Sequence, residues 1–191
     1  DTATGVDPDD LPYFLSLLQH LSGNGLSCPM PIERRDETGL GKVLGQLSGR
    51  PAALVSFLQG RASIAPKPPQ CKSAGAALAR LHLAGEGFAM QRANSQGPDN
   101  WQNLFALCRD EADEVTPGLG ELIAGELTYL QAHWPQDLPQ GVIHADLFPD
   151  NVFFIGTEVS GLIDFYFACH DMLAYDLAIM INAWCFDNQK A

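Results

Sequence analysis

The stretch HADLFPDN, residues 144–151, brings His144, Asp146, Asp150 and Asn151 together within a few positions. An apolar run, GVI, precedes it and another, VFFI, follows it. Short apolar runs of this kind predict two buried strands, and the polar stretch between them is then the connecting loop. Because functional groups are often carried on loops held by a rigid scaffold, we expect chemistry at this loop.

A further acidic residue follows the next pair of predicted strands. Val152–Ile155 and Val159–Ile163 are predicted to pair around a Gly-Thr turn, and Asp164 comes directly after them. Asn151 starts the first strand of this hairpin and Asp164 ends the second. We therefore expect these two side chains to converge at one end of a small sheet, with Asp146 on the loop just before it.

This set of side chains suits phosphoryl transfer. Mg²⁺ prefers oxygen ligands such as those of Asp and Asn, and a carboxylate is needed to orient the attacking hydroxyl. Protein kinases use an Asp and an Asn in one loop and a metal-binding Asp after a hairpin, and Asp146, Asn151 and Asp164 occur in that order. Two simpler interpretations stay open: Asp146 and Asn151 could cap turns, or the three could hold the metal of a hydrolase.

Composition limits the possible partners and location. The chain has 191 residues and a net charge of −12, which disfavours binding to nucleic acid or to anionic lipid. The five cysteines are scattered and form no CxxC pair, as is typical of reduced thiols in a cytoplasmic protein. No apolar run is long enough to span a bilayer, and no signal peptide is visible.

The first part of the chain predicts a helix followed by strands. Asp7 is expected to cap a helix that Gly23 to Gly25 ends. Residues 28–50 are expected to contain a short hairpin, and Pro51–Leu58 a buried strand. Ile64–Pro69, with its three prolines, is the predicted linker.

The middle and the end of the chain predict further helices. Gln70–Ala84 is expected to be an amphipathic helix, with His82 as a core or interface histidine. Trp101–Cys108 is predicted to be helical, and Thr116 is expected to cap a helix that runs to about residue 133. The final helix is predicted within residues 171–185.

Several stretches together resemble a known family. HADLFPDN (144–151), SGLIDF (160–165) and AYDLA (174–178) are similar to the phosphotransferase group that includes aminoglycoside phosphotransferases and choline kinases. Within that group, longer stretches such as DPDDLPYFLSLLQHL (7–21) and ALARLHLAG (77–85) resemble the bacterial homoserine kinases. The resemblance covers most of residues 6–187.

The resemblance implies an α+β, protein-kinase-like two-lobed fold. Residues 1–60 would be a remnant of the small N-terminal lobe, with a helix, a hairpin and the hinge strand. Residues 61–191 would be the helical C-terminal catalytic lobe, which carries the catalytic β-hairpin. Members of the family begin with a small sheet that covers the phosphates and continue with helices beyond AYDLA, so we expect the chain to be truncated at both ends.

The resemblance also implies roles for individual residues. Asp146 would be the catalytic base that faces the substrate hydroxyl, and Asn151 and Asp164 would hold Mg²⁺ on the phosphates of ATP. Asp176 and His144 would support the loop, Asp176 through hydrogen bonds.

The predicted function is that of an ATP-dependent kinase, a transferase that phosphorylates the hydroxyl of L-homoserine in threonine biosynthesis. Backbone groups of Ser56, Phe57 and Leu58 would meet the adenine of ATP at the hinge. Two alternatives remain: a related phosphotransferase that acts on choline, an aminoglycoside or another small alcohol, and a catalytically incomplete nucleotide-binding fragment.

Overall fold

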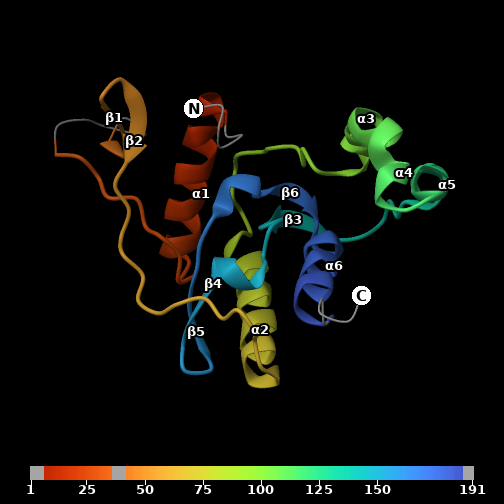
Figure 1. The fold of residues 1–191 in the computed structure, drawn as a ribbon. Helices are drawn as coiled ribbons and strands as arrows, with labels where there is room; N and C mark the ends of the chain where they lie inside the picture. The colour runs from red at the N-terminus through yellow and green to blue at the C-terminus, as the bar shows by residue number, and fades with distance from the viewer. Residues whose placement is uncertain (1–6, 36–41, 187–191) are drawn as a thin grey trace. The chain divides into compact units, whose positions relative to one another are not determined.

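The computed structural model describes residues 7–35 and 42–186 and combines α-helices with two-stranded antiparallel sheets (Figure 1). This confirms the predicted α+β class. The chain separates into two compact units, one made of Asp1–Ala93 and Pro139–Ala191 and the other of Asn94–Leu138. The predicted division into lobes at residues 60 and 61 stays a prediction. No helix in the described ranges is long and apolar enough to cross a membrane.

The first unit begins with the helix that its acidic start predicts. The carboxylate of Asp7 accepts a hydrogen bond from the Asp9 backbone N–H at 3.0 Å, which caps the 3-10 turn η1 (Pro8–Asp10). Helix α1 (Leu11–Gly23) continues directly from this turn and buries one apolar face. Gly25, with a φ of +83°, turns the chain away at the end of the helix.

The first hairpin lies later in the chain than predicted. Strand β1 (Leu44–Leu47) pairs with β2 (Arg50–Ala53), whereas residues 28–50 were expected to contain the whole hairpin. The prediction of a buried strand over Pro51–Leu58 is wrong, because β2 ends at Ala53 and Phe57 is 91% exposed. Beyond β2, residues 54–56 pair with residues 30–32 through an isolated bridge between Pro31 and Val55. Within the described residues no second layer covers the side chains of Leu54 and Phe57, which stay exposed.

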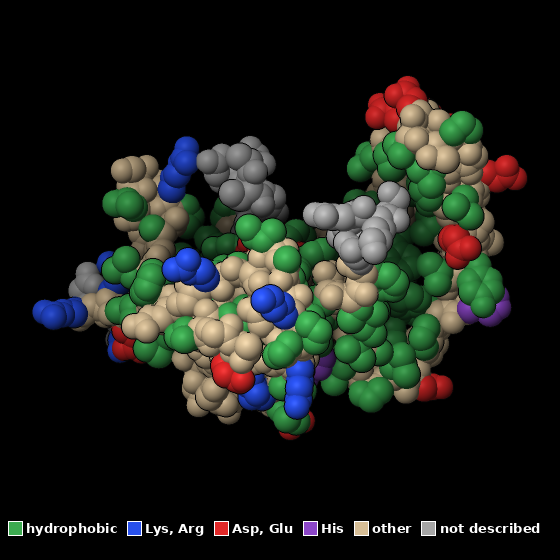
Figure 2. Space-filling model, turned by 60° about the horizontal axis from the view of Figure 1, so that its bottom comes forward, with side chains coloured by type: hydrophobic (Ala, Val, Ile, Leu, Met, Phe, Trp, Pro, Cys, Tyr) green, Lys and Arg blue, Asp and Glu red, His purple; other side chains and the backbone are tan. Residues whose placement is uncertain are grey.

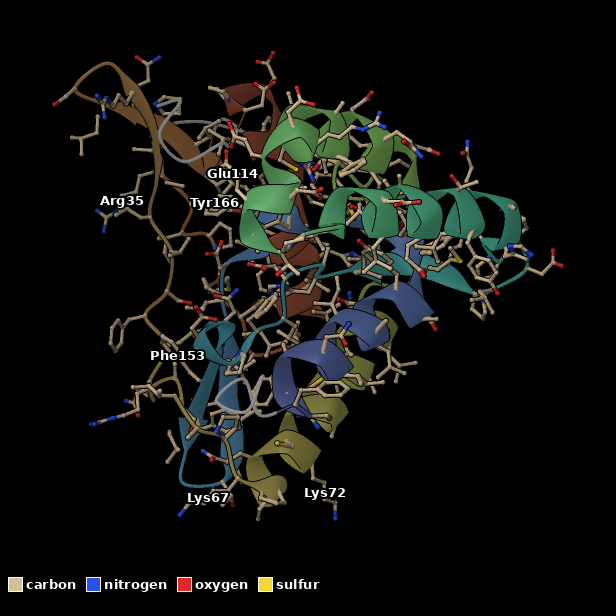
Figure 3. All side chains as sticks on the ribbon, turned by 45° about the vertical axis from the view of Figure 1, so that its right-hand side comes forward. Arg35, Lys67, Lys72, Glu114, Phe153 and Tyr166 are labelled. Atoms are coloured by element: carbon tan, nitrogen blue, oxygen red, sulfur yellow. The ribbon has the colours of Figure 1, made fainter. Side chains whose placement is uncertain are left out.

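Helix α2 (Pro68–Ala84) starts inside the predicted linker. Proline fits the first turn of a helix, where its missing N–H costs nothing, and the Gln70 side chain caps the start by accepting from the Lys67 N–H at 3.0 Å. Lys67 and Lys72 point outward at this end of the molecule (Figure 3). At the other end, a Cβ on Gly85 would lie 2.8 Å from the Val142 Cβ, so only glycine permits this close approach to the next strand.

The C-terminal part of the first unit holds two antiparallel pairs. Strand β4 (Val152–Ile155) pairs with β5 (Glu158–Leu162), as predicted. Strand β3 (Gln140–Ile143) pairs with β6 (Cys169–Met172), which was not predicted because residues 169–172 carry two polar side chains. Helix α6 (Leu173–Trp184) follows at once.

The core of the first unit lies among α1, α2, α6 and the two C-terminal sheets. Leu17, Leu21 and Leu81 are fully buried there. Leu147, from the polar loop between β3 and β4, is also fully buried, and its carbonyl accepts a hydrogen bond from the Trp184 indole at 2.7 Å. The core therefore anchors this loop through one apolar side chain and one backbone group.

The second unit is helical, with α3 (Pro98–Cys108), η3 (Arg109–Glu111), α4 (Ala112–Val115) and α5 (Leu119–His133). The prediction that Thr116 caps the last of these is wrong. Gly118, with a φ of +85°, turns the chain just before α5, and the Thr116 hydroxyl instead donates to the Val115 carbonyl at 2.8 Å. Figure 2 shows acidic side chains at the surface, and those of residues 110, 111, 113 and 114 in this unit are exposed.

Candidate functional site

The loop between β3 and β4 folds back on itself. The Phe148 N–H donates to the Asp146 carbonyl at 2.8 Å, and the Asn151 N–H donates to the Phe148 carbonyl at 3.0 Å. Residues 149–151 form the 3-10 turn η4 (Pro149–Asn151), which leads directly into β4. This tight course of the backbone brings the side chain of Asn151 back to Asp146.

Asp146 and Asn151 are held together by two hydrogen bonds. The Asn151 Nδ2 donates to the Asp146 carbonyl at 2.7 Å and to its Oδ2 at 3.0 Å. Both bonds use the amide nitrogen, so the Asn151 side-chain oxygen forms no hydrogen bond within the described residues. An amide oxygen without a partner on a buried side chain is a ready ligand for a hard cation.

The pKa of Asp146 is raised above its ordinary value, first of all by burial. The negative charges of Asp164 and Asp150 raise it further, whereas His144 and the hydrogen bond from Asn151 oppose the shift. The charge of Asp164 acts on Asp146, so the two carboxyl groups are close enough to interact although 17 residues lie between them in the sequence.

Asp164 lies at the end of the β4–β5 hairpin, as the sequence predicts. The Ile163 N–H donates to the Asn151 carbonyl at 3.0 Å, which extends the pairing of the two strands to the residues before Asp164. Asp164 itself has a left-handed backbone, with a φ of +63°, and its exposed carboxylate forms no hydrogen bond within the described residues. A strained conformation at an exposed carboxylate is typical of a functional position.

His144 is buried and organises the loop. Its Nε2 donates to the Ile163 carbonyl at 3.0 Å, and its ring packs against Phe165, with centroids 4.6 Å apart. Burial lowers the pKa of His144, so the ring is neutral at pH 7. His144 therefore joins the loop before Asp146 to the turn that carries Asp164.

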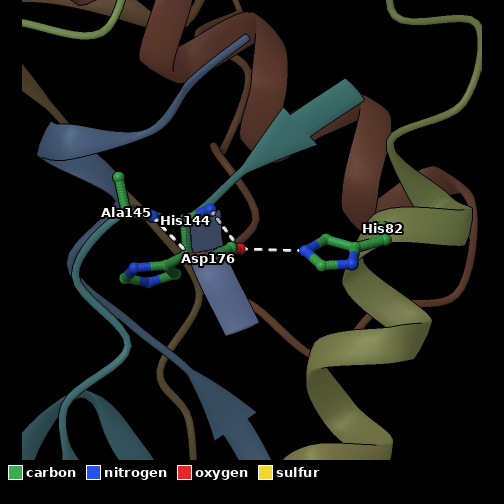
Figure 4. A network of polar contacts seen from close by, with 4 residues as sticks. All are labelled: His82, His144, Ala145 and Asp176. Atoms are coloured by element: carbon green, nitrogen blue, oxygen red, sulfur yellow. Dashed lines mark hydrogen bonds and ion pairs between the residues drawn. The ribbon is translucent and has the colours of Figure 1, made fainter. Parts of the chain in front are cut away.

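Asp176, on the first turn of α6, holds the backbone at the start of the loop (Figure 4). Its Oδ2 accepts from the His144 N–H at 2.9 Å, and its Oδ1 accepts from the Ala145 N–H at 3.0 Å. Ala145 has a φ of +60°, a left-handed conformation that alanine rarely adopts. The two hydrogen bonds stabilise this strained residue, which directly precedes Asp146.

The buried carboxylate of Asp176 has a third partner that the sequence did not predict. The His82 Nε2 lies 2.9 Å from the Asp176 Oδ2 (Figure 4). His82 comes from α2, and 94 positions separate the two residues. No local spacing could have linked them, and the sequence marked His82 only as a core or interface histidine of the predicted helix.

The segment predicted to contact adenine, Ser56 to Leu58, is hydrogen-bonded at its first residue, whereas the next two residues keep their backbone N–H groups available within the described ranges. The Ser56 N–H donates to the Met30 carbonyl at 2.8 Å, and the Ser56 hydroxyl accepts from the Met30 N–H at 2.9 Å. The backbone N–H groups of Phe57 and Leu58 donate no hydrogen bond within residues 7–35 and 42–186. The Leu58 side chain lies over β5, because a Cβ on Gly161 would come within 2.6 Å of its Cδ1.

A cavity lies between Val55, which directly precedes this segment, and Asp164 at the end of the hairpin. It has a volume of ≈ 250 Å³, and both Val55 and Asp164 line it, together with the apolar side chains of Phe14 and Leu15 from α1. Pocket walls of this apolar character with one charged group are typical of small-ligand sites.

The residues present fit a Mg²⁺ ion that also binds phosphate. The described ranges contain no cluster of three or more His, Cys, Asp or Glu that could hold a metal alone. Asn151 and Asp164 instead offer one amide oxygen and one carboxylate, and Mg²⁺ commonly takes one or two such protein ligands and completes its shell with phosphate and water oxygens.

Known proteins resemble this chain in sequence and in fold. The chain is 58% identical over 186 residues to the homoserine kinase of Rhizobium rhizogenes and 56% identical to that of Agrobacterium fabrum; each match covers 97% of this chain. The chain spans 57% and 56% of the length of these two curated relatives.

Among solved structures, an amicoumacin kinase in complex with AMP-PNP and Ca²⁺ matches 91% of this chain and 53% of its own, with a TM-score of 0.60 and 15% identity. This likeness shows a shared fold. The sequence matches the family of phosphotransferase enzymes over residues 3–191. Together with the arrangement of Asp146, Asn151 and Asp164, this match shows that the chain belongs to the phosphotransferase enzyme family.

Proposed function

We propose that the protein to which this chain belongs transfers the γ-phosphoryl group of ATP to the side-chain hydroxyl of L-homoserine, a step of threonine biosynthesis in the cytoplasm. The identity of 58% to a homoserine kinase over 97% of this chain supports the substrate. The observation that carries the chemistry is the Asp146 carboxylate, held by Asn151 on a loop whose backbone Asp176 fixes.

Asp146 would orient the substrate hydroxyl and accept its proton as the oxygen attacks phosphorus. The Asn151 side chain leaves one Asp146 carboxylate oxygen without a hydrogen bond from the described residues, which is the oxygen we assign to the hydroxyl. The negative charge of Asp164 beside Asp146 raises the proton affinity of this carboxylate. No covalent intermediate is needed, because the chain supplies position and electrostatics.

Asn151 and Asp164 would hold Mg²⁺. The ion neutralises charge on the phosphates of ATP when it is bound. No hydrogen bond within the described residues uses the side-chain oxygen of Asn151 or the carboxylate of Asp164, and their place at a paired hairpin end supports this assignment. We assign the adenine to the backbone of Ser56, Phe57 and Leu58, and the open N–H groups of Phe57 and Leu58 support that choice.

We also propose the lobe assignment that the sequence predicts. Residues 1–60 would contribute to the small lobe and residues 61–191 to the helical lobe, with the nucleotide between them. The position of Leu58 over β5 fits a hinge that passes close to the catalytic hairpin.

The test is Mg²⁺-dependent ADP release with L-homoserine, with choline and an aminoglycoside as competing acceptors. It is run on this chain and on a chain extended to the length of its relatives. Asp146→Asn is expected to lower kcat by at least ~100-fold, because general-base catalysis contributes about that much. The matched control is Asp150→Asn, an exposed carboxylate of the same loop, which is expected to keep most of the activity.

Activity with homoserine alone that Asp146→Asn abolishes supports the proposal. Equal or faster turnover of choline or the aminoglycoside would transfer the proposal to another acceptor. The absence of ADP release by the extended chain with every acceptor would contradict a kinase function and favour a nucleotide-binding fragment.

A further inference from the structure

A second cavity lies entirely within the helical second unit. It has a volume of ≈ 290 Å³, and it is lined by the first turns of α3, the second half of α5 and the residues that follow α5. Trp101 comes from α3, and Trp134 is the residue directly after α5. None of its lining side chains lies within residues 144–164, so the cavity shares no residue with the site proposed for phosphoryl transfer.

Two tryptophans form a corner in this cavity. The rings of Trp101 and Trp134 are nearly perpendicular, at 88°, and their centroids are 5.1 Å apart. The Trp101 indole N–H donates to the Gln96 carbonyl at 2.7 Å, which fixes this ring from the side of the chain before α3. A compact group in such a corner can contact the faces of both rings. The faces of tryptophan attract cations more strongly than those of tyrosine or phenylalanine.

The polar side chains of the cavity include one negative charge, from Asp99, and no Lys, Arg or His among the described residues. Asp99 lies on the first turn of α3, and its exposed carboxylate forms no hydrogen bond or ion pair within the described ranges. The amide side chains of Gln102, Gln131 and Gln136 also line the cavity. A carboxylate beside two indole rings suits an ammonium group, because both attract positive charge.

The charge of the whole second unit favours the same class of ligand. Asn94–Leu138 contains eight Asp or Glu residues and one Arg, so its net charge is −7 out of the −12 of the whole chain. Such a surface raises the local concentration of cations and disfavours anions. An organic cation also buries its apolar substituents against the rings, which a hydrated metal ion cannot do.

We propose that this cavity is a binding site for a small organic ammonium ion, either a quaternary amine or the ammonium group of an amino acid. The rings of Trp101 and Trp134 contact the cation, and Asp99 neutralises its charge. The amide groups of the three glutamines donate hydrogen bonds to a hydroxyl or carboxylate elsewhere on the ligand. The inference goes beyond the proposed phosphoryl transfer and does not depend on it, because binding alone defines the site.

The tryptophans themselves report whether the cavity is occupied. The chain has three tryptophans, and the third, Trp184, is buried in the core of the first unit. Nuclear magnetic resonance follows the indole N–H signal of each, so Trp184 is an internal control. Choline is titrated into this chain and into the version extended to the length of its relatives, at constant ionic strength. The alcohol in which a carbon atom replaces the nitrogen of choline has the same shape without the charge, and it is titrated in parallel.

Choline is expected to shift the Trp101 and Trp134 signals, to leave the Trp184 signal unchanged, and to bind ~10-fold more tightly than the uncharged alcohol. L-Homoserine is titrated in the same way. Tighter binding of L-homoserine than of choline assigns the site to an amino acid, and the reverse order assigns it to a quaternary amine.

Three variants test the residues of the site. Trp134→Leu removes one ring and is expected to weaken choline binding by ~10-fold, and Trp101→Phe, which retains an aromatic face, by a smaller factor. Asp99→Asn is expected to weaken it by about threefold to fivefold, as for an exposed charge pair. The matched control is Asp110→Asn, an exposed carboxylate of the same unit outside the cavity, which is expected to change the affinity by less than about twofold.

Four results would overturn the inference. The first is that neither choline nor L-homoserine shifts the Trp101 and Trp134 signals. The second is equal affinity for choline and the uncharged alcohol, and the third is an equal effect of Asp99→Asn and Asp110→Asn. The fourth is binding by this chain that is lost in the extended chain, because the added segments would then fill the cavity.

Discussion

Replacing Asp176 by alanine is expected to destabilise the protein far more than a typical substitution. The variant leaves the N–H groups of His144 and Ala145 and the His82 ring without their acceptor, in a region that is fully buried at Asp176. Hydrogen bonds to charged groups contribute about 1.5–3 kcal/mol each. Three donors would lose their acceptor at a buried position, and we expect a loss of about 3–5 kcal/mol because some of them can still rearrange or reach water.

The loss is measured by urea unfolding, followed by circular dichroism, with the slope of the transition compared between variants. For a domain of this size, it corresponds to a fall in Tm of about 6–20 °C. Asp176→Asn keeps one oxygen acceptor and is expected to lose less, and exposed Asp150→Asn is expected to change stability by less than ~0.5 kcal/mol. A loss below ~1 kcal/mol in Asp176→Ala would refute the idea that this carboxylate fixes the loop.

Gly85→Ala is expected to destabilise the protein by about 1–3 kcal/mol in the same urea assay, because its Cβ would clash with β3. Gly75→Ala on the same helix has open space and is expected to be neutral or stabilising. Burial raises the pKa of the Cys28 thiol to about 12, so a thiol reagent at pH 8 should label exposed Cys108 and spare Cys28 until unfolding. Burial lowers the pKa of His144, so below about pH 6.5 the unfolded chain binds more protons than the folded protein. The free energy of unfolding should therefore decrease as the pH falls below about 6.5, and it should decrease less in His144→Gln than in the unsubstituted protein.

The local pattern around residues 144–164 predicted its structure well. The hairpin β4–β5 follows from two short apolar runs on either side of a Gly-Thr turn, and a hairpin needs only contacts between neighbouring segments. The same register explains why Asn151 and Asp164 lie at one end of the sheet. Helix α1 was predictable from the acidic cap at its start. Helix α2 was predicted from its amphipathic pattern, although the prolines of its first turn had been assigned to a linker.

The wrong predictions share a physical cause. Residues 54–58 are apolar enough for a buried strand, but burial depends on a second layer that no local pattern encodes. Thr116 has the right chemistry for a helix cap, yet the left-handed turn at Gly118 moved the start of α5 beyond its reach. Strand β6 was missed because its pairing with β3 supplies the ladder that its own polar sequence does not suggest.

The sequence by itself determined the loop, the hairpin and the three side chains proposed for phosphoryl transfer, because residues close in the chain carry all of these features. Only the tertiary structure decided how the loop is held. The contact between His82 and Asp176 joins residues 94 positions apart, and the strain at Ala145 exists only where that buried carboxylate opposes it. Such contacts depend on how α2 and α6 pack against β3, and packing between distant segments has no signature in any single stretch of the chain.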